Sequence, residues 1–220
     1  MLARPLEYWT NISPAREDMN ATFAEAILAA YPLQSPENDL ANLGPPDFIP
    51  PAYPYGTQWR RTTTYYTDST FEANRRLTCQ TWTAAGIPAY CFRFNAISSW
   101  AGPYDGATHF VDMAFAMKNV LGVGYEPIRS PPFEGLSEGY VELATLMSGD
   151  WVSFVVNGDP NAWERGRVMK SLQESVPAWE EYAAAVFEYE GNRTVDMRAD
   201  DWRVEGIALI NSANKEVYGR

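Results

Sequence analysis

Proline recurs so densely between residues 32 and 58 that neither a helix nor a central strand can run through this stretch. Proline has no backbone N–H and removes a hydrogen bond from any ladder that it enters. The prolines concerned are Pro32, Pro36, Pro45, Pro46, Pro50, Pro51 and Pro54. Too little chain precedes them to make a domain of its own. We therefore interpret 32–58 as a Pro-rich surface loop of one domain covering 1–220, with an interdomain linker as the alternative.

The composition is that of an ordinary globular protein and excludes several functions. The chain has 220 residues, of which 46% are hydrophobic and 20% charged, enough to bury a core. Its net charge of −11 would repel phosphate backbones, so no nucleic-acid partner is expected. No apolar run approaches the roughly 20 residues that a membrane span needs, and residues 1–9 lack the apolar core of a signal peptide.

Two features leave the compartment open. Cys79 and Cys91 are the only cysteines, and the sequence alone does not place their Cα atoms close enough to pair. Three sequons would accept N-linked glycans if the chain is secreted: Asn11-Ile12-Ser13, Asn20-Ala21-Thr22 and Asn192-Arg193-Thr194. Such short motifs also arise by chance.

Hydrophobic spacing predicts four main helices. One covers 13–31 and starts at Ser13-Pro14, and a second covers 68–85 with Asp68 as its cap. A third runs from 137 to 156, and a fourth follows Asp200-Asp201 and extends to Asn211. The third helix carries one apolar stripe, made of Tyr140, Leu143, Ala144, Met147, Trp151, Phe154 and Val155.

Strands are predicted between these helices. The aromatic run 89–94 reads as a buried strand, and 185–190 pairs with 194–197 as a hairpin around a Gly191-Asn192 turn. A short apolar helical segment spans 109–119. Helices and strands mix along the chain, so the fold class is α/β or α+β.

The segment Gly135-Leu136-Ser137-Glu138-Gly139 matches the nucleophile elbow G-x-S-x-G. That elbow requires a buried strand before the serine, and Pro131-Pro132 excludes one here. We interpret Ser137 instead as the N-cap of the helix that follows.

His109 is the only histidine, so no ordinary zinc site can form, and no metal or cofactor is indicated. It follows a predicted strand and a Gly/Pro loop, a place where α/β folds put catalytic groups. Asp112 lies three residues later and can meet it on a helix. On the residues alone, a structural role for His109 remains the commoner interpretation. The adjacent pairs Glu180-Glu181 and Asp200-Asp201 read as solvated faces or caps.

Ordered short matches extend from about residue 20 to residue 212. They are Ala29-Ala30-Tyr31-Pro32, Pro54-Tyr55-Gly56-Thr57, Asp68-Ser69-Thr70-Phe71, Ala84-Ala85-Gly86-Ile87-Pro88, Tyr90-Cys91-Phe92-Arg93-Phe94-Asn95, Gly106-Ala107-Thr108-His109-Phe110-Val111-Asp112, Leu136-Ser137, Trp151-Val152-Ser153-Phe154, Gly158-Asp159-Pro160-Asn161, Pro177-Ala178-Trp179 and Asp201-Trp202-Arg203-Val204-Glu205-Gly206-Ile207. On these motifs the chain resembles the C-terminal part of type-B carboxylesterases and lipases, the cholinesterase-like branch of the α/β-hydrolases, and fungal members in particular.

The resemblance implies an α/β-hydrolase fold with an incomplete central sheet. In that family a Ser–Glu/Asp–His triad cleaves carboxylic esters through an acyl-enzyme, and the histidine of the matched segment corresponds to His109. Asp112 matches a carboxylate beside it that we read as supporting. Trp100 and Tyr104 are the expected substrate-lining residues, on an aromatic loop beside the gorge.

The resemblance also implies missing parts. The serine elbow, the oxyanion-hole loop and the triad acid of the family lie upstream of the matched segment. Glu7 is the nearest candidate for the triad acid, but it lacks the glycine that normally follows that acid in the family. The chain alone is then expected to be inactive and to expose the apolar stripes of 68–85 and 137–156. It should be marginally stable, aggregated, or completed by a complementing polypeptide. The alternative is a truncated, non-catalytic homologue that binds a ligand or pairs with a partner. The family suggests secretion, although no signal peptide is visible.

Overall fold

The computed structural model describes residues 19–33, 58–101, 106–124, 130–164, 176–191 and 195–219. These residues divide into two compact units. We call the one containing 19–33, 58–78 and 201–219 the helical unit, and the one containing the described residues from 79 to 200 the sheet unit. Most of the Pro-rich segment 32–58 lies outside the described residues, and the expectation of a single domain stays a prediction.

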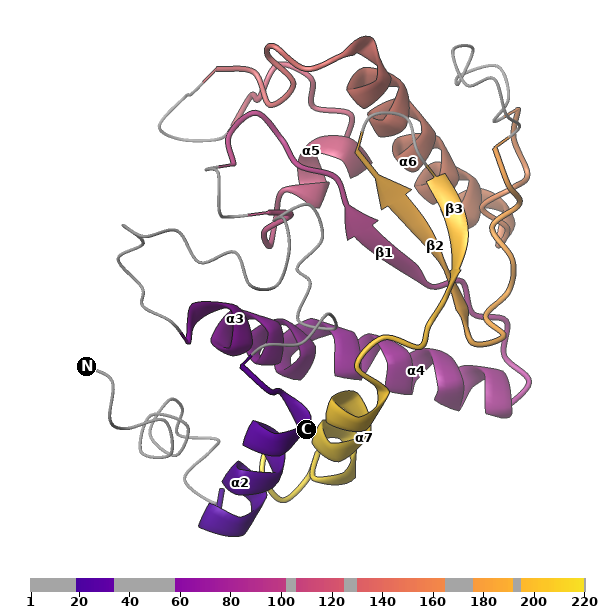
Figure 1. The fold of residues 1–220 in the computed structure, drawn as a ribbon. Coiled ribbons are helices and arrows are strands. Elements are labelled where there is room, and N and C mark those ends of the chain that lie inside the picture. Colours follow the sequence, from indigo (N-terminus) through magenta and orange to yellow (C-terminus); the bar gives the residue numbers. More distant parts are fainter. Residues whose placement is uncertain are drawn as a thin grey trace. The chain divides into compact units, whose positions relative to one another are not determined.

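The sheet unit is built on a small mixed sheet in the order β1-β2-β3 (Figure 1). Strand β1 (Phe92–Asn95) runs parallel to β2 (Ala185–Glu190), with Phe92 opposite Phe187. Strand β3 (Val195–Ala199) pairs antiparallel with β2 and completes the predicted hairpin. The fold is therefore a partial α/β fold, and β1 lies at one edge of its sheet.

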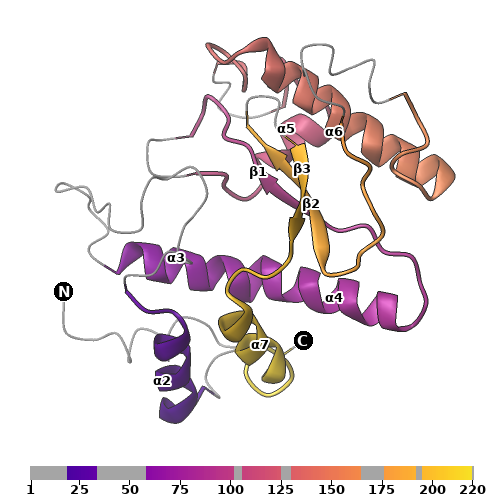
Figure 2. The same ribbon diagram turned by 45° about the vertical axis from the view of Figure 1, so that its right-hand side comes forward.

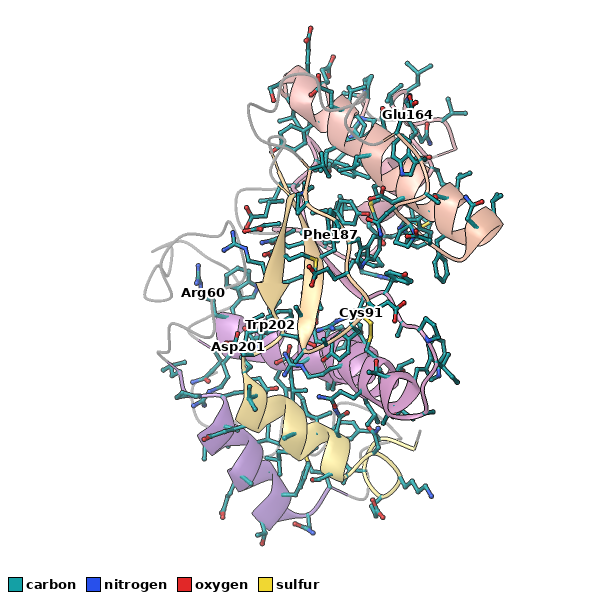
Figure 3. The ribbon with its side chains drawn as sticks, turned by 90° about the vertical axis from the view of Figure 1, so that its right-hand side faces the viewer. Arg60, Cys91, Glu164, Phe187, Asp201 and Trp202 are labelled. Atoms are coloured by element: carbon teal, nitrogen blue, oxygen red, sulfur yellow. A yellow bond between two sulfur atoms is a disulfide. The ribbon has the colours of Figure 1, made fainter. Side chains whose placement is uncertain are left out.

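Two helices cover one face of this sheet in both ribbon views (Figure 2): α5 (Asp112–Ala116) and α6 (Glu138–Asn157). They build the core of the unit with inward-facing strand residues. Its largest fully buried members are Phe115, Leu143, Leu146, Met147, Phe187 and Tyr189. The indole of Trp179 also belongs to this core and stacks on the ring of Phe187, which Figure 3 labels. The two ring centroids lie 5.2 Å apart.

The apolar stripe of α6 is buried only in the first half of the helix. Leu143, Ala144 and Met147 of the predicted stripe lie in the core, and Tyr140 is half-buried. In the second half the apolar side chains are exposed: Trp151 by 37%, Phe154 by 47%, Val155 by 80% and Val156 by 72%. An apolar helix face outside the core is what an incomplete fold is expected to leave.

The helical unit begins with α2 (Ala21–Ala30), which is capped by Asn20. The predicted start of this helix at Ser13-Pro14 lies outside the described residues. Helix α3 (Trp59–Thr67) continues through the π-helical segment η3 (Asp68–Glu72) into α4 (Ala73–Ala84). The prediction that Asp68 caps a helix at 68–85 is therefore wrong, because Asp68 lies inside a helical run. The apolar positions Phe71 and Trp82 of that predicted stripe are exposed.

A buried ion pair explains the position of Asp68. Its carboxylate accepts hydrogen bonds from Arg203 Nε and Nη2, each at 2.6 Å, and from the Tyr31 hydroxyl at 2.8 Å. Burial lowers the pKa of Arg203, but the hydrogen bond and the charge of Asp68 outweigh it and hold that pKa above its ordinary value. Burial, followed by the charge of Asp68, raises the pKa of Tyr31. Such a pair tolerates the loss of neither partner.

Arg203 also starts the last helix, α7 (Val204–Ser212), in a left-handed conformation with φ 48°. The predicted cap at Asp200-Asp201 is wrong: Asp200 instead accepts a hydrogen bond from the Tyr182 hydroxyl at 2.8 Å within the sheet unit. Ahead of α7, Trp202 lies under the guanidinium groups of Arg75 and Arg76 (Figure 3).

Cys79 and Cys91 form a disulfide, a question that the sequence left open. It joins the second half of α4 to the residue before β1, and the sulfur–sulfur bond lies beside the Cys91 label in Figure 3. Both cysteines are buried, at 3% and 7% exposure.

Candidate functional site

The only histidine lies on the connection that leaves the carboxyl end of β1. Residues 106–111 lead into α5, and His109 occupies an exposed turn at its start. In open α/β sheets, ligands bind outside the carboxyl ends of parallel strands, and β1 is parallel to β2. An exposed imidazole there can take up and return a proton.

Phe110 adopts a strained backbone beside this histidine. Its φ of 75° is rare for a residue with a large side chain, and the residue is 56% exposed. The two ring centroids lie 6.2 Å apart in an edge-on arrangement. Strain of this kind concentrates at functional sites, which makes the His109 turn the first place to look for function.

Asp112 opens α5 three residues after His109, as the sequence predicted. Burial raises the pKa of the Asp112 carboxyl. Hydrogen bonds from backbone N–H groups and the electrostatic influence of His109 oppose this rise in part. The turn 109–111 separates the imidazole-bearing residue from this carboxylate by only three positions. A carboxylate in this position can support a histidine as it takes up a proton.

Trp100 is half-buried and fixed to two turns of the sheet unit. Its indole N–H donates to the carbonyl of Ser130, and a Cβ added at Gly122 would lie 3.0 Å from its ring. The neighbouring Ser99 hydroxyl donates to the Pro131 carbonyl at 2.9 Å. Tyr104, the other predicted lining residue, lies outside the described residues, so the lining role of both residues stays a prediction. Glu7, the nearest candidate for the triad acid, also lies outside the described residues.

Ser137 occupies the N-cap position of α6, in extended backbone, although its side chain makes no capping hydrogen bond. Residues 130–136 form turns and bends, with Gly135 at φ 75°. The described stretch before Ser137 thus contains no strand that would make it a nucleophile elbow.

Sequence reasoning missed a buried carboxylate in α6. Asp150 has no solvent exposure and accepts hydrogen bonds from the Trp163 indole N–H at 2.8 Å and the Tyr189 hydroxyl at 2.9 Å. A charged residue between Met147 and Trp151 in an apolar helix was the signal available. Both carboxylate oxygens of Asp150 accept a hydrogen bond, so Asp150 connects α6 to β2 and to the loop of Trp163. We interpret its role as structural.

A second missed carboxylate lies on β2. Glu188 is buried, accepts a hydrogen bond from Asn95 at 3.0 Å and pairs with Arg93 at 3.3 Å. Burial raises the pKa of Glu188, and Arg93 opposes this shift only in part. This cluster joins β1 to β2 across the sheet.

The described residues contain neither a metal-binding cluster nor a membrane-spanning helix. No group of three or more His, Cys, Asp or Glu side chains in the described ranges is arranged to hold a metal ion. Nor does any described helix combine the length and apolar character needed to cross a membrane.

Comparison with known proteins gives a result for the fold only. The sequence matches no protein-family model and no curated protein. The structure is similar to EstA of Aspergillus niger, with a TM-score of 0.64 and 14% identity over 97% of this chain. It is also similar to the carboxylesterase EST55 of Geobacillus stearothermophilus, with a TM-score of 0.51 and 21% identity over 92% of this chain.

This chain spans 38% of the EstA chain and 33% of the EST55 chain. Both are esterases of the α/β-hydrolase type, so the chain has part of an esterase-like α/β-hydrolase fold. The structural similarity supports the fold that the sequence resemblance implied. Identities this low carry no information about the residues that act in catalysis.

Proposed function

We propose that this chain is the histidine-bearing, C-terminal part of a serine carboxylesterase of the type-B carboxylesterase and lipase family, with His109 as its general base. The observation that carries the proposal is the placement of the only histidine in a chain with this fold. His109 is exposed on the connection that follows β1, next to Phe110 with its positive φ and three residues before Asp112.

The chemistry follows from that position. His109 would take the proton of a serine hydroxyl as its oxygen attacks the ester carbonyl carbon. The tetrahedral intermediate would then collapse to an acyl-enzyme, and His109 would return the proton to the departing alcohol. A water molecule would next lose a proton to His109 as its oxygen attacks the acyl carbon. The bond between the acyl carbon and the serine oxygen would then break, the acid would leave, and His109 would return the proton to the serine. Asp112 would stabilise the imidazolium in both halves of the cycle.

The serine, the oxyanion hole and the triad acid would come from polypeptide outside this chain. Two features support a complementing polypeptide. The second half of α6 exposes Trp151, Phe154 and neighbouring valines, and β1 has no partner strand on its outer edge within the described sheet. A parallel strand is normally buried on both faces and paired on both edges, so this edge is where further strands would add.

The substrate class would be a small-molecule carboxylic ester. We place Trp100 and Tyr104 at the border of its pocket, on the loop between β1 and His109. Most of the acyl and alcohol pockets would be formed by the complementing polypeptide, so this chain alone selects no particular ester.

The test uses the full reading frame that encodes this segment, expressed with whatever lies upstream in frame. We expect hydrolysis of p-nitrophenyl acetate or butyrate, and a fall in kcat/KM by about ten-thousandfold for His109→Ala. Glu134→Gln, at an exposed position of the sheet unit, serves as the control and should retain full activity. An unchanged rate in His109→Ala would rule out the general-base role.

A non-catalytic, partner-pairing homologue is the second candidate, and the exposed half of α6 favours it as well. It would be supported if the natural product carried no upstream serine elbow and turned over no activated ester, yet was isolated with a second polypeptide bound.

A further inference from the structure

The start of α2 presents a glycosylation motif in a usable geometry. Asn20-Ala21-Thr22 fits the acceptor pattern for N-linked glycans, and all three residues are exposed. Asn20 has the extended backbone of an N-cap, with φ −76° and ψ 163°. The buried face of the helix, with Ala24 and Ile27, lies one turn further on.

The two side-chain atoms of Asn20 have separate tasks. Its Oδ1 accepts a hydrogen bond from the backbone N–H of Phe23 at 2.9 Å and so caps the helix. Its Nδ2 is the atom that a glycan would occupy. A glycosylated asparagine is still an amide with a carbonyl oxygen, so modification at Nδ2 leaves the cap in place.

The disulfide supplies an independent observation. Cys79 and Cys91 are joined and buried. Disulfides persist mainly in secreted proteins and in the lumen of the secretory pathway, the compartment in which N-linked glycans are added. A sequon alone arises by chance. A sequon with an exposed acceptor, in a chain that carries a buried disulfide, fits passage through that compartment.

We propose that Asn20 is an N-glycosylation site. Its Nδ2 would form a bond to the anomeric carbon of an oligosaccharide carried on a lipid pyrophosphate. The pyrophosphate would leave with the electron pair of the broken carbon–oxygen bond, and one Nδ2 proton would pass to a base of the transferring enzyme. The glycan would extend from the exposed end of α2, while Oδ1 continues to cap the helix.

The first test uses the protein from its own source, at whatever chain length it is made. Glycans are released with an amidase in heavy-oxygen water, and the peptide containing residue 20 is read by mass spectrometry. We expect a labelled aspartate at position 20. An unmodified Asn20 as the main form would overturn the proposal. The peptides with Asn11 and Asn192 are read separately, so they do not confuse the result.

Variants made in a secreting eukaryotic host separate the glycan from the helix cap. Thr22→Ala should lose one glycan mass, whereas Thr22→Ser should keep it, because both serine and threonine complete the acceptor motif. Asn20→Asp should lose the glycan and keep the cap, since aspartate also caps helices. A Thr22→Ala protein that carries the same mass of glycan as the parent would refute the site. None of these readouts depends on esterase activity.

Discussion

Phe110 is the residue whose conformation is hardest to explain without function. A φ of 75° costs a residue with a large side chain about 1–3 kcal/mol, and Phe110 is more than half exposed, so packing offsets little of that cost. Glycine adopts this backbone freely and loses about 0.5–1 kcal/mol through its own entropy. Replacing Phe110 with glycine therefore measures the strain of Phe110 against the entropy cost of glycine.

We expect Phe110→Gly to raise the free energy of unfolding by about 1 kcal/mol, measured by urea denaturation. Met117→Gly is the matched control. Met117 is exposed, lies at the end of α5, the short helix that follows Phe110, and has a negative φ of −89°. That control should lower the free energy of unfolding by about 0.5–1 kcal/mol. Equal losses in both variants would mean that Phe110 is not strained.

At the residue scale, the sequence identifies His109 because it is unique, and it identifies Asp112 because of helical spacing. It does not predict the positive φ values of Phe110 and Arg203, because this backbone region is rare for residues that carry a large side chain. Nor does it predict that Asp68 pairs with Arg203 across 135 residues. The sequence shows that Asp68 carries a charge, but its burial is explained only by the distant partner Arg203.

At the element scale, the disulfide fixes the connection between α4 and β1. The two cysteines are 12 residues apart, so the bond closes a short loop and restricts the unfolded chain. The double variant Cys79→Ala/Cys91→Ala should therefore lower the free energy of unfolding by about 2–4 kcal/mol, measured by chemical denaturation under oxidising conditions.

Reduction provides the control for this prediction. Dithiothreitol should lower the stability of the parent protein to near that of the double variant, and should leave the double variant unchanged. A parent protein with equal stability in both conditions would show that the pair is not bonded in solution.

Elements were predictable where local patterns are strong. The hairpin at 185–190 and the helix at 137–156 agree with β2, β3 and α6 because alternation and helical periodicity are clear there. The helix at 68–85 was placed too late because Asp68 resembles a cap, whereas the helical run starts at Trp59. Asp200-Asp201 also resembles a cap, but the last helix begins later, at Val204, with Arg203 as its N-cap.

At the scale of the whole molecule, the chain contains two units, and the sheet unit carries an exposed apolar surface of its own. That surface runs along the second half of α6 and includes Val152, Val155 and Val156, each more than half exposed. An open groove lined by Gly149, Val152, Val156 and Trp163, among others, lies along the same helix. Monomeric proteins rarely expose a contiguous apolar surface of this kind, so another protein surface should cover it.

The isolated chain should therefore self-associate through α6, measured as a concentration-dependent mass by light scattering after gel filtration. Val152→Glu/Val156→Lys should weaken that association at least about tenfold, because it removes two apolar side chains while the net charge stays the same. Val204→Glu/Ala208→Lys is the matched control: it places the same i,i+4 pair on exposed positions of α7 in the helical unit. If both pairs change the mass equally, or the parent is monomeric throughout, α6 is not the contact surface. A selective effect of the α6 pair would instead locate the surface that a complementing polypeptide has to cover.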